Sequence, residues 1–223
     1  MAQKTATNEQ KAKRTFYDLV IKRAADILIS GLGILILLPL FLILSIIIVI
    51  DDPGPVFFTQ KRIGINKTYI KIHKFRSMKM STPHDMPTHL LEDPDQYITR
   101  AGRFLRRFSI DELPQLFDIF AGKMALIGPR CALWNQDDLV EARDRYQAND
   151  IRPGLTGWAQ INGRDTLEIE DKARFDGIYA TELKKSNSAG IKMDLKCFFR
   201  SIKVVLTHAG EVEGGTGRKK TDK

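Results

Sequence analysis

The feature that most limits how this chain can fold is the run of residues 27–50, which is almost wholly apolar. As a helix, roughly 24 residues at about 1.5 Å each extend about 36 Å, which is long enough to cross a bilayer. The sequence DDPGP follows at residues 51–55, where a secretory signal peptide would carry a small-residue cleavage site. We therefore expect the segment to stay in the protein as a membrane helix.

Two features of this segment oppose a simple crossing of the membrane. Pro39 lies in its middle and predicts a bend, because proline removes a helical hydrogen bond and clashes with the preceding turn. Basic residues flank both ends, whereas a spanning helix concentrates them on one side. These residues are Lys11, Lys13, Arg14, Lys22 and Arg23 before the segment and Lys61, Arg62 and Lys67 after it. A helix that bends back to its own leaflet accounts for both features, and a kinked spanning helix is the alternative.

The charge and the cysteines limit the partners and the environment. The formal net charge of +8 favours anionic partners, which include phosphates, acidic lipids and nucleic acid. Cys131 and Cys197 have no CxxC spacing, so they indicate neither a disulfide framework nor a zinc site, and a reducing, cytosol-facing environment fits. The histidines show no paired-ligand spacing, so we assign them no metal. They are His73, His84, His89 and His208.

The remaining patterns alternate between strands and helices, which predicts one helix-rich α/β domain. We expect a hairpin of strands at residues 56–63 and 68–75 and a short extended piece at 124–127. Helices are expected at 98–108, 110–121, 139–147 and 167–183. A loop at 81–95 and a Gly-rich irregular stretch at 152–164 complete the prediction. Residues 195–206 carry an apolar stripe with basic residues beside it, which is typical of an interfacial helix but equally of a core-packed one.

The acidic pair Asp111 and Glu112 has two interpretations. In the first, Ser109 is the N-cap of a helix, Glu112 reaches back to it in a capping box, and Asp111 benefits from the helix dipole. In the second, the cations around the pair gather phosphate oxygens, and the carboxylates take part in phosphate chemistry. These cations are Arg100, Arg103, Arg106, Arg107 and Arg130.

Four ordered motifs carry a resemblance that favours the second interpretation. They are KFRSM at residues 74–78, SIDELPQ at 109–115, GPR at 128–130 and RPGLTGWAQINGR at 152–164. Together they resemble the bacterial sugar transferases, the monotopic polyprenyl-phosphate phosphoglycosyltransferases, over about residues 17–210. One departure is Cys131, where the family commonly has a proline, and it affects the geometry expected for this loop.

The resemblance implies a bacterial inner-membrane enzyme with four parts: a basic segment at 1–18, a re-entrant helix broken at Pro39 at 19–52, a cytosolic catalytic domain at 53–210 that rests on amphipathic helices, and a disordered tail at 211–223. It implies that Asp111 attacks the β-phosphate of a nucleoside diphosphate sugar, for which we expect a UDP-sugar. A covalent phosphosugar forms and the nucleoside monophosphate leaves. A polyprenyl phosphate, usually that of undecaprenol, then accepts the sugar phosphate. Mg²⁺ beside Asp111 would suit the charge of the diphosphate.

Within this scheme each candidate residue receives a role. We expect Glu112 to be a metal-side or acid/base partner of Asp111. The expected phosphate ligands are Arg107 and Arg130, then Lys74 and Arg76, with Arg152 and Arg164 holding the nucleotide or lipid phosphate. Trp158 either stacks on a base or fills the core.

Two other functions remain open from the sequence. One is a membrane-bound diphosphate hydrolase that uses the same metal and carboxylates. The other is a membrane-tethered adaptor or nucleic-acid binder, although no motif that combines aromatic and basic residues supports a nucleic-acid partner. The sequence does not name the sugar or say whether the chain forms a homo-oligomer.

Overall fold

The computed structural model describes residues 14–82 and 94–207, so the tail expected at 211–223 and most of the loop expected at 81–95 lie outside it. The described chain is a helix-rich α/β structure, as predicted. Its helices are α1 (Lys22–Asp51), α2 (Arg100–Arg107), α3 (Gln115–Phe120), α4 (Asp137–Asp144), α5 (Trp158–Ile161), α6 (Ile169–Lys185) and α7 (Asn187–Thr207). Its strands are β1 (Phe57–Ile63), β2 (Tyr69–Phe75), β3 (Ala125–Ile127) and β4 (Gly154–Thr156).

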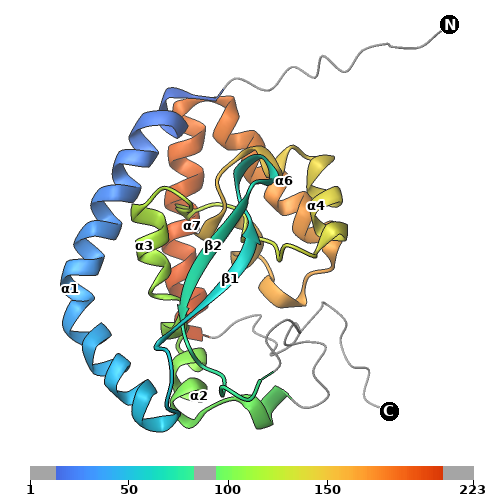
Figure 1. The fold of residues 1–223 in the computed structure, drawn as a ribbon. Coiled ribbons are helices and arrows are strands. Elements are labelled where there is room, and N and C mark those ends of the chain that lie inside the picture. Colours follow the sequence, from blue (N-terminus) through green and yellow to red (C-terminus); the bar gives the residue numbers. More distant parts are fainter. Residues whose placement is uncertain (1–13, 83–93, 208–223) are drawn as a thin grey trace, which may run out of the picture.

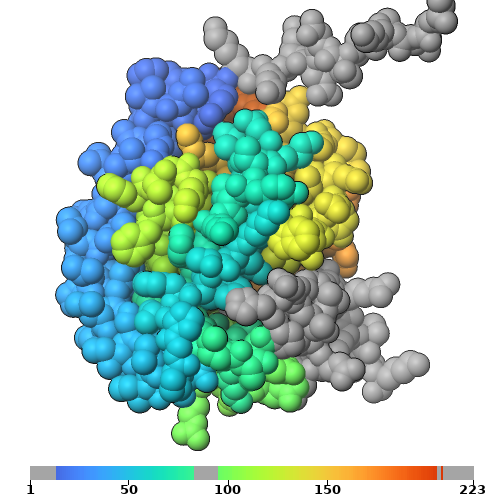
Figure 2. All heavy atoms as spheres, viewed as in Figure 1, coloured from blue at the N-terminus to red at the C-terminus, as the bar shows by residue number. Residues whose placement is uncertain are grey.

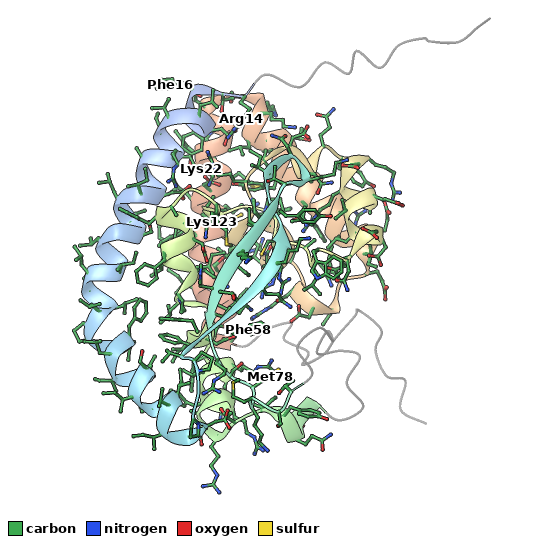
Figure 3. The ribbon with its side chains drawn as sticks, in the orientation of Figure 1. Arg14, Phe16, Lys22, Phe58, Met78 and Lys123 are labelled. Carbon is green, nitrogen blue, oxygen red and sulfur yellow. The ribbon has the colours of Figure 1, made fainter. Side chains whose placement is uncertain are left out.

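The apolar segment forms α1, which is bowed around one side of the molecule (Figure 1). Its concave side contacts α2, α3 and β3, and Phe41, Leu44 and Ile48 are buried there. Its convex side carries exposed apolar side chains, which project away from the domain in Figure 3. Only 17% of its most apolar window is buried, so α1 is not the core helix of a soluble domain. The long axis of the helix therefore lies along the domain, and one apolar face of the helix stays exposed.

Pro39 lies inside α1 without interrupting it. The bend expected from this proline agrees with the bowed shape in Figure 1, but the break into two helices does not occur. A proline removes one helical hydrogen bond, and the packed turn that follows it keeps the second half helical.

The predicted hairpin is confirmed. Strands β1 and β2 pair antiparallel, with Phe57 opposite Phe75 and Ile63 opposite Tyr69. A short 3₁₀ turn, Ile65–Lys67, joins them. One face of β2 is buried through Ile72 and Phe75, each 1% exposed. The hairpin crosses the front of the molecule and brings the end of β2 to the centre of the domain (Figure 2).

A second, parallel pair supports the centre of the domain. In it Ala125 of β3 lies opposite Gly154 of β4, and Ile127 lies opposite Thr156. The backbones approach so closely that a Cβ added to Gly154 would lie 2.1 Å from the amide nitrogen of Gly128. Only glycine permits this contact. The predicted irregular stretch at 152–164 is therefore partly regular, because close packing against β3 orders it.

Helix α7 has two faces of different character. Met193 and Cys197 are buried against Tyr179 and Leu183 of α6. Leu195, Phe198, Phe199 and Ile202 of the predicted stripe are exposed, at 52%, 47%, 64% and 47%. The core-packed interpretation is therefore wrong for these four side chains, which present an apolar surface to the outside.

The start of α1 is held by Asp194 of α7. Its carboxylate accepts hydrogen bonds from Tyr17 Oη at 2.6 Å, from Lys22 Nζ at 2.7 Å and from Tyr179 Oη at 2.6 Å. Asp194 and Lys22 are 6% and 7% exposed, and Figure 3 labels Lys22 at this end of α1. A buried charge needs such partners, so this cluster fixes α1 to α6 and α7.

We predict that Asp194→Asn lowers the thermal unfolding midpoint of the purified protein by about 10 °C. The substitution leaves the Lys22 ammonium buried without a counter-charge, which costs about 3–5 kcal/mol, and each kcal/mol shifts the midpoint by about 2–4 °C in a chain of this size. The matched control is Asp171→Asn, since its ion pair with Arg174 is exposed. Equal midpoints for the two variants would contradict the role given to Asp194.

Candidate active site

The acidic pair lies in a single 3₁₀ turn, Ile110–Glu112, between α2 and α3. The continuous helix expected at 110–121 is wrong, because Pro114 has no N–H to donate to the Ile110 carbonyl and α3 begins only after it. The capping box is also wrong. Ser109 has a left-handed backbone, with φ 53°, and its side chain makes no capping hydrogen bond. The local, structural explanation of the pair therefore fails.

Glu112 is held by two cations from other elements. Its Oε1 accepts a hydrogen bond from Lys74 Nζ of β2 at 2.7 Å and from Arg130 Nη2 at 2.5 Å, and its Oε2 accepts one from Arg130 Nη1 at 3.1 Å. Burial alone would raise the pKa of Glu112, but the charges of Arg130 and Lys74 and their hydrogen bonds hold it well below its usual value. Glu112 is thus a fixed anion whose oxygens are already engaged.

Asp111 has the opposite character. It is 8% exposed, and no hydrogen bond reaches its carboxylate from the residues that the structure describes. Burial raises its pKa, against the lowering effect of Lys74, and the charge of Glu112 raises it further. Arg106 and Arg130 also act to lower the pKa. A desolvated carboxylate with free oxygen lone pairs and nearby cations is suited to attack a phosphorus atom.

The cations predicted from the sequence divide into two groups. Lys74 and Arg130 lie at the acidic pair. Arg107 is exposed, and its guanidinium lies 5.8 Å from the ring centroid of Phe108. The neighbouring Arg106 acts to lower the pKa of Asp111 and donates a hydrogen bond to Ser77 Oγ at 3.1 Å. Consecutive helical residues point about 100° apart. The sequence therefore identified the helix that brings a cation to Asp111, but it named Arg107 where the structure places Arg106.

Two other predicted phosphate ligands lie away from the pair. Arg76 donates from Nη1 to Asp52 Oδ2 at 2.8 Å, and it also bonds the Asp52 carbonyl, so it ties the end of α1 to the end of β2. Arg152 donates a hydrogen bond to the carbonyl of Gly122 at 3.2 Å. Charged residues near the start of α1 contribute to the shift of its pKa. Neither arrangement supports the phosphate roles expected for them.

Arg164 lines a cavity of about 180 Å³ that Arg130 also borders. The other polar residues of its wall come from separate segments, and of these only Gln160 lies in a motif singled out from the sequence, the one at residues 152–164. They include Arg62, Gln136, Arg143, Gln160, Asp165, Lys172 and Asp176.

Trp158 lies next to this cavity but belongs to the core. It packs against the cluster around Tyr179, and Lys196 and Arg200 of α7 lie 4.6 Å and 5.5 Å from its ring centroid. This packing favours the core-filling interpretation of Trp158, although its indole N–H is buried without a hydrogen-bond partner among the described residues.

The acidic pair fits a metal held through one carboxylate. Among residues 14–82 and 94–207, no three His, Cys, Asp or Glu side chains converge as a metal cage. The oxygens of Glu112 are engaged by cations, while those of Asp111 are not. Mg²⁺ is commonly bound by one or two carboxylates together with substrate phosphates. The donor set therefore suits a metal that arrives with a diphosphate, with Asp111 as its protein ligand.

Comparison with known proteins agrees with this site. The chain matches the family described as bacterial sugar transferase over residues 17–208. The exopolysaccharide production protein PSS of Rhizobium leguminosarum bv. phaseoli is 37% identical over 198 residues, which cover 85% of this chain and 97% of that protein. Undecaprenyl-phosphate glucose phosphotransferase of Komagataeibacter xylinus is 37% identical over 201 residues, which cover 87% of this chain.

A third relative is UDP-glucose:undecaprenyl-phosphate glucose-1-phosphate transferase of Escherichia coli (strain K12), which is 38% identical over 170 residues, or 73% of this chain. The matched region is 37% of the length of the Komagataeibacter protein and 36% of the length of the Escherichia protein. The family match spans both the acidic pair and α1. The chain belongs to the bacterial sugar transferase family.

Proposed function

We propose that this protein transfers a sugar 1-phosphate from a UDP-sugar to undecaprenyl phosphate and so begins the assembly of a surface glycan. The observation that carries the proposal is the buried Asp111 carboxylate, which is free of hydrogen bonds from the described residues and lies in the field of Lys74, Arg106 and Arg130. The names of the relatives supply the UDP-sugar and the undecaprenyl phosphate.

In the first step an oxygen of Asp111 attacks the β-phosphorus of the donor. The bond between that phosphorus and the oxygen bridging to the α-phosphate breaks, and UMP leaves with the electron pair. Lys74 and Arg130 offset the negative charge of the diphosphate, as cationic side chains do in other phosphoryl transfers. Mg²⁺ bound with the substrate at Asp111 would supply further charge neutralisation.

In the second step a phosphate oxygen of the lipid attacks the phosphorus held by Asp111. The aspartyl phosphorus–oxygen bond breaks, the carboxylate is regenerated, and the lipid diphosphate sugar leaves. Because the two substrates react in turn, one set of cations serves both, and the kinetics are of the ping-pong type. Glu112 keeps Lys74 and Arg130 in place throughout, which makes it a positioning residue.

The attachment of α1 at both ends supports a re-entrant topology. At its start Lys22 pairs with Asp194, and at its end Asp52 pairs with Arg76 while Asp51 accepts the Ala101 N–H at 2.8 Å. All of these partners belong to one folded domain, which cannot lie on two sides of a membrane. We infer that both ends of α1 face the cytoplasm and that its convex apolar face lies in the inner leaflet of the inner membrane.

We predict that Asp111→Asn abolishes covalent labelling of the protein by a UDP-sugar whose β-phosphate and sugar carry the label. The amide has nearly the same shape but is a poor nucleophile. Since burial raises the pKa of Asp111, its ionised form is disfavoured in the folded protein, and removal of the charge leaves the unfolding midpoint unchanged or higher.

The exposed Asp137→Asn variant is the control and is expected to label normally. Parallel reactions with Mg²⁺ and with EDTA test the metal. Labelling of Asp111→Asn would overturn the nucleophile, labelling in EDTA would overturn the metal, and UMP release without added undecaprenyl phosphate in multiple turnovers would identify a hydrolase.

We predict that Glu112→Gln acts differently. The change leaves the buried charges of Arg130 and Lys74 without a counter-charge, so we expect a loss of about 3 kcal/mol and a midpoint lower by about 6–12 °C. Labelling of Asp111 slows at least tenfold but persists, because the nucleophile is intact. A variant as stable as the wild type, or one that does not label at all while folded, would contradict a positioning role.

We predict that cysteines at positions 13 and 68, one before and one after α1, react with a membrane-impermeant maleimide from the same side. Lys13→Cys and Thr68→Cys are made singly, since the native Cys131 and Cys197 are buried. Labelling is compared in inside-out and right-side-out vesicles. Labelling from opposite sides would show a spanning helix and would contradict the re-entrant topology.

A further inference from the structure

The cavity beside Arg130 contains a buried amide that has no partner. Gln160 of α5 is 7% exposed, and neither its Oε1 nor its Nε2 makes a hydrogen bond with any described part of the protein. Folded proteins rarely bury such a group, because both atoms lose their hydrogen bonds to water. Gln160 lines the 180 Å³ cavity, so a ligand in that cavity can supply both missing partners.

The charges around the cavity show where an anion would lie. Arg130 pairs with Glu112 and Arg143 pairs with Asp176, so these guanidinium groups are compensated. Arg62 instead donates to neutral oxygens, those of the Cys131 carbonyl and the Gln60 side chain. It therefore brings positive charge to the cavity without a paired carboxylate.

Lys172 adds to this surplus. It lines the same cavity, where the charges of Asp165 and Glu168 act on it. The wall still holds five cations, Arg62, Arg130, Arg143, Arg164 and Lys172, against the two carboxylates of Asp165 and Asp176. Lys172 and Arg62 are half-buried, and burial lowers the pKa of both. The cavity therefore combines a neutral donor and acceptor, at Gln160, with a surplus of positive charge that favours a phosphate.

The size of the cavity favours a single ring. A protein cavity of about 150 Å³ holds benzene, so 180 Å³ accommodates one six-membered ring and leaves a ribose and its phosphates outside, toward the cations. Asp176 Oδ1, which also lacks a partner in the wall, is an acceptor suited to a hydroxyl group.

The shape of an amide favours a pyrimidine over an acetamido sugar. A primary amide offers its oxygen and one N–H on the same edge, so it can engage a partner whose donor and acceptor also lie side by side. The Watson–Crick edge of a pyrimidine has this arrangement. The trans acetamido group of a sugar directs its N–H and its carbonyl in opposite directions and can satisfy only one atom of Gln160.

We propose that this cavity binds the pyrimidine base of the donor nucleotide, with Gln160 Nε2 donating to a base carbonyl and Gln160 Oε1 accepting from the ring N–H. The inference rests on the proposed function and adds the site of the leaving nucleotide. Arg130 connects the two parts, since it borders the cavity and binds Glu112 next to Asp111. The nucleotide then lies on the Arg130 side of the reacting phosphorus.

The test measures binding of released product to the full-length protein in nanodiscs, without any reaction. Dissociation constants are measured by calorimetry for UMP, for 3-methyluridine 5′-monophosphate, which lacks the ring N–H, and for ribose 5-phosphate. We expect the wild type to bind UMP about tenfold to hundredfold more tightly than the methylated analogue, because the analogue loses the hydrogen bond from the ring N–H and leaves Gln160 Oε1 buried without a partner. In Gln160→Met the affinity for UMP falls to that of the analogue, while that for ribose 5-phosphate is unchanged.

Gln147→Met is the matched control, because Gln147 is exposed and does not line the cavity. This variant should keep the preference for UMP. Gln160→Glu repeats the test if the methionine variant unfolds. It keeps the acceptor for the ring N–H but loses the donor to the base carbonyl, so its affinity for UMP should fall while UMP still binds more tightly than the methylated analogue.

Three results would overturn the proposal: unchanged UMP affinity in both Gln160 variants, an equal loss for UMP and ribose 5-phosphate, or a loss for a sugar 1-phosphate in place of UMP. A failure of the proposed function is separate. If the wild type binds UMP with this preference but never releases it from a UDP-sugar in the presence of undecaprenyl phosphate, the transfer reaction is wrong and the base site stands.

Discussion

The ion cluster around Glu112 is the interaction on which the rest of the site depends. A carboxylate this deeply buried is stable only with cations beside it, and these come from β2 through Lys74 and from the segment after β3 through Arg130. Bringing them together requires the hairpin to cross the domain and requires the glycine contact between β3 and β4. Asp111 gains its position from its neighbour, and the reactivity proposed for it comes from having no such partners.

The ion cluster around Glu112 is connected to α6 through the backbone carbonyl of Arg130 and the side chain of Arg143. The carbonyl of Arg130 accepts a hydrogen bond from Arg143 at 2.9 Å, and Arg143 pairs with the buried Asp176 of α6. The wall of the cavity that holds Gln160 is built on this connection. The acidic pair and the proposed base site are therefore two ends of one chain of paired charges, with Arg130 shared between them.

The membrane helix is integrated into the domain in a comparable way. Buried polar contacts hold its two ends, and apolar contacts of Phe41, Leu44 and Ile48 hold its middle, so its position relative to the acidic pair is set by the fold. The lipid phosphate proposed as acceptor suits this arrangement, because in the proposed reaction its phosphate reaches Asp111 while its chain stays in the bilayer. The exposed apolar face of α7 adds a second surface of the same character.

Local patterns in the sequence determined the elements whose cause is local. The apolar run, the hairpin, the short strand at residues 124–127 and the helices at α4, α6 and α7 follow from periodicity and turn residues, and the ordered motifs identified the family and Asp111. The sequence did not determine which cations meet the acidic pair. Arg76 and Arg152 have the right charge but are bound to Asp52 and to Gly122, whereas Arg106, Arg62 and Gln160 face the site from separate segments. Only the tertiary structure decided these contacts, because the direction of a side chain depends on what its element packs against. The predicted capping box failed for the same reason. Glu112 binds two cations that are distant in the sequence in place of the backbone of Ser109.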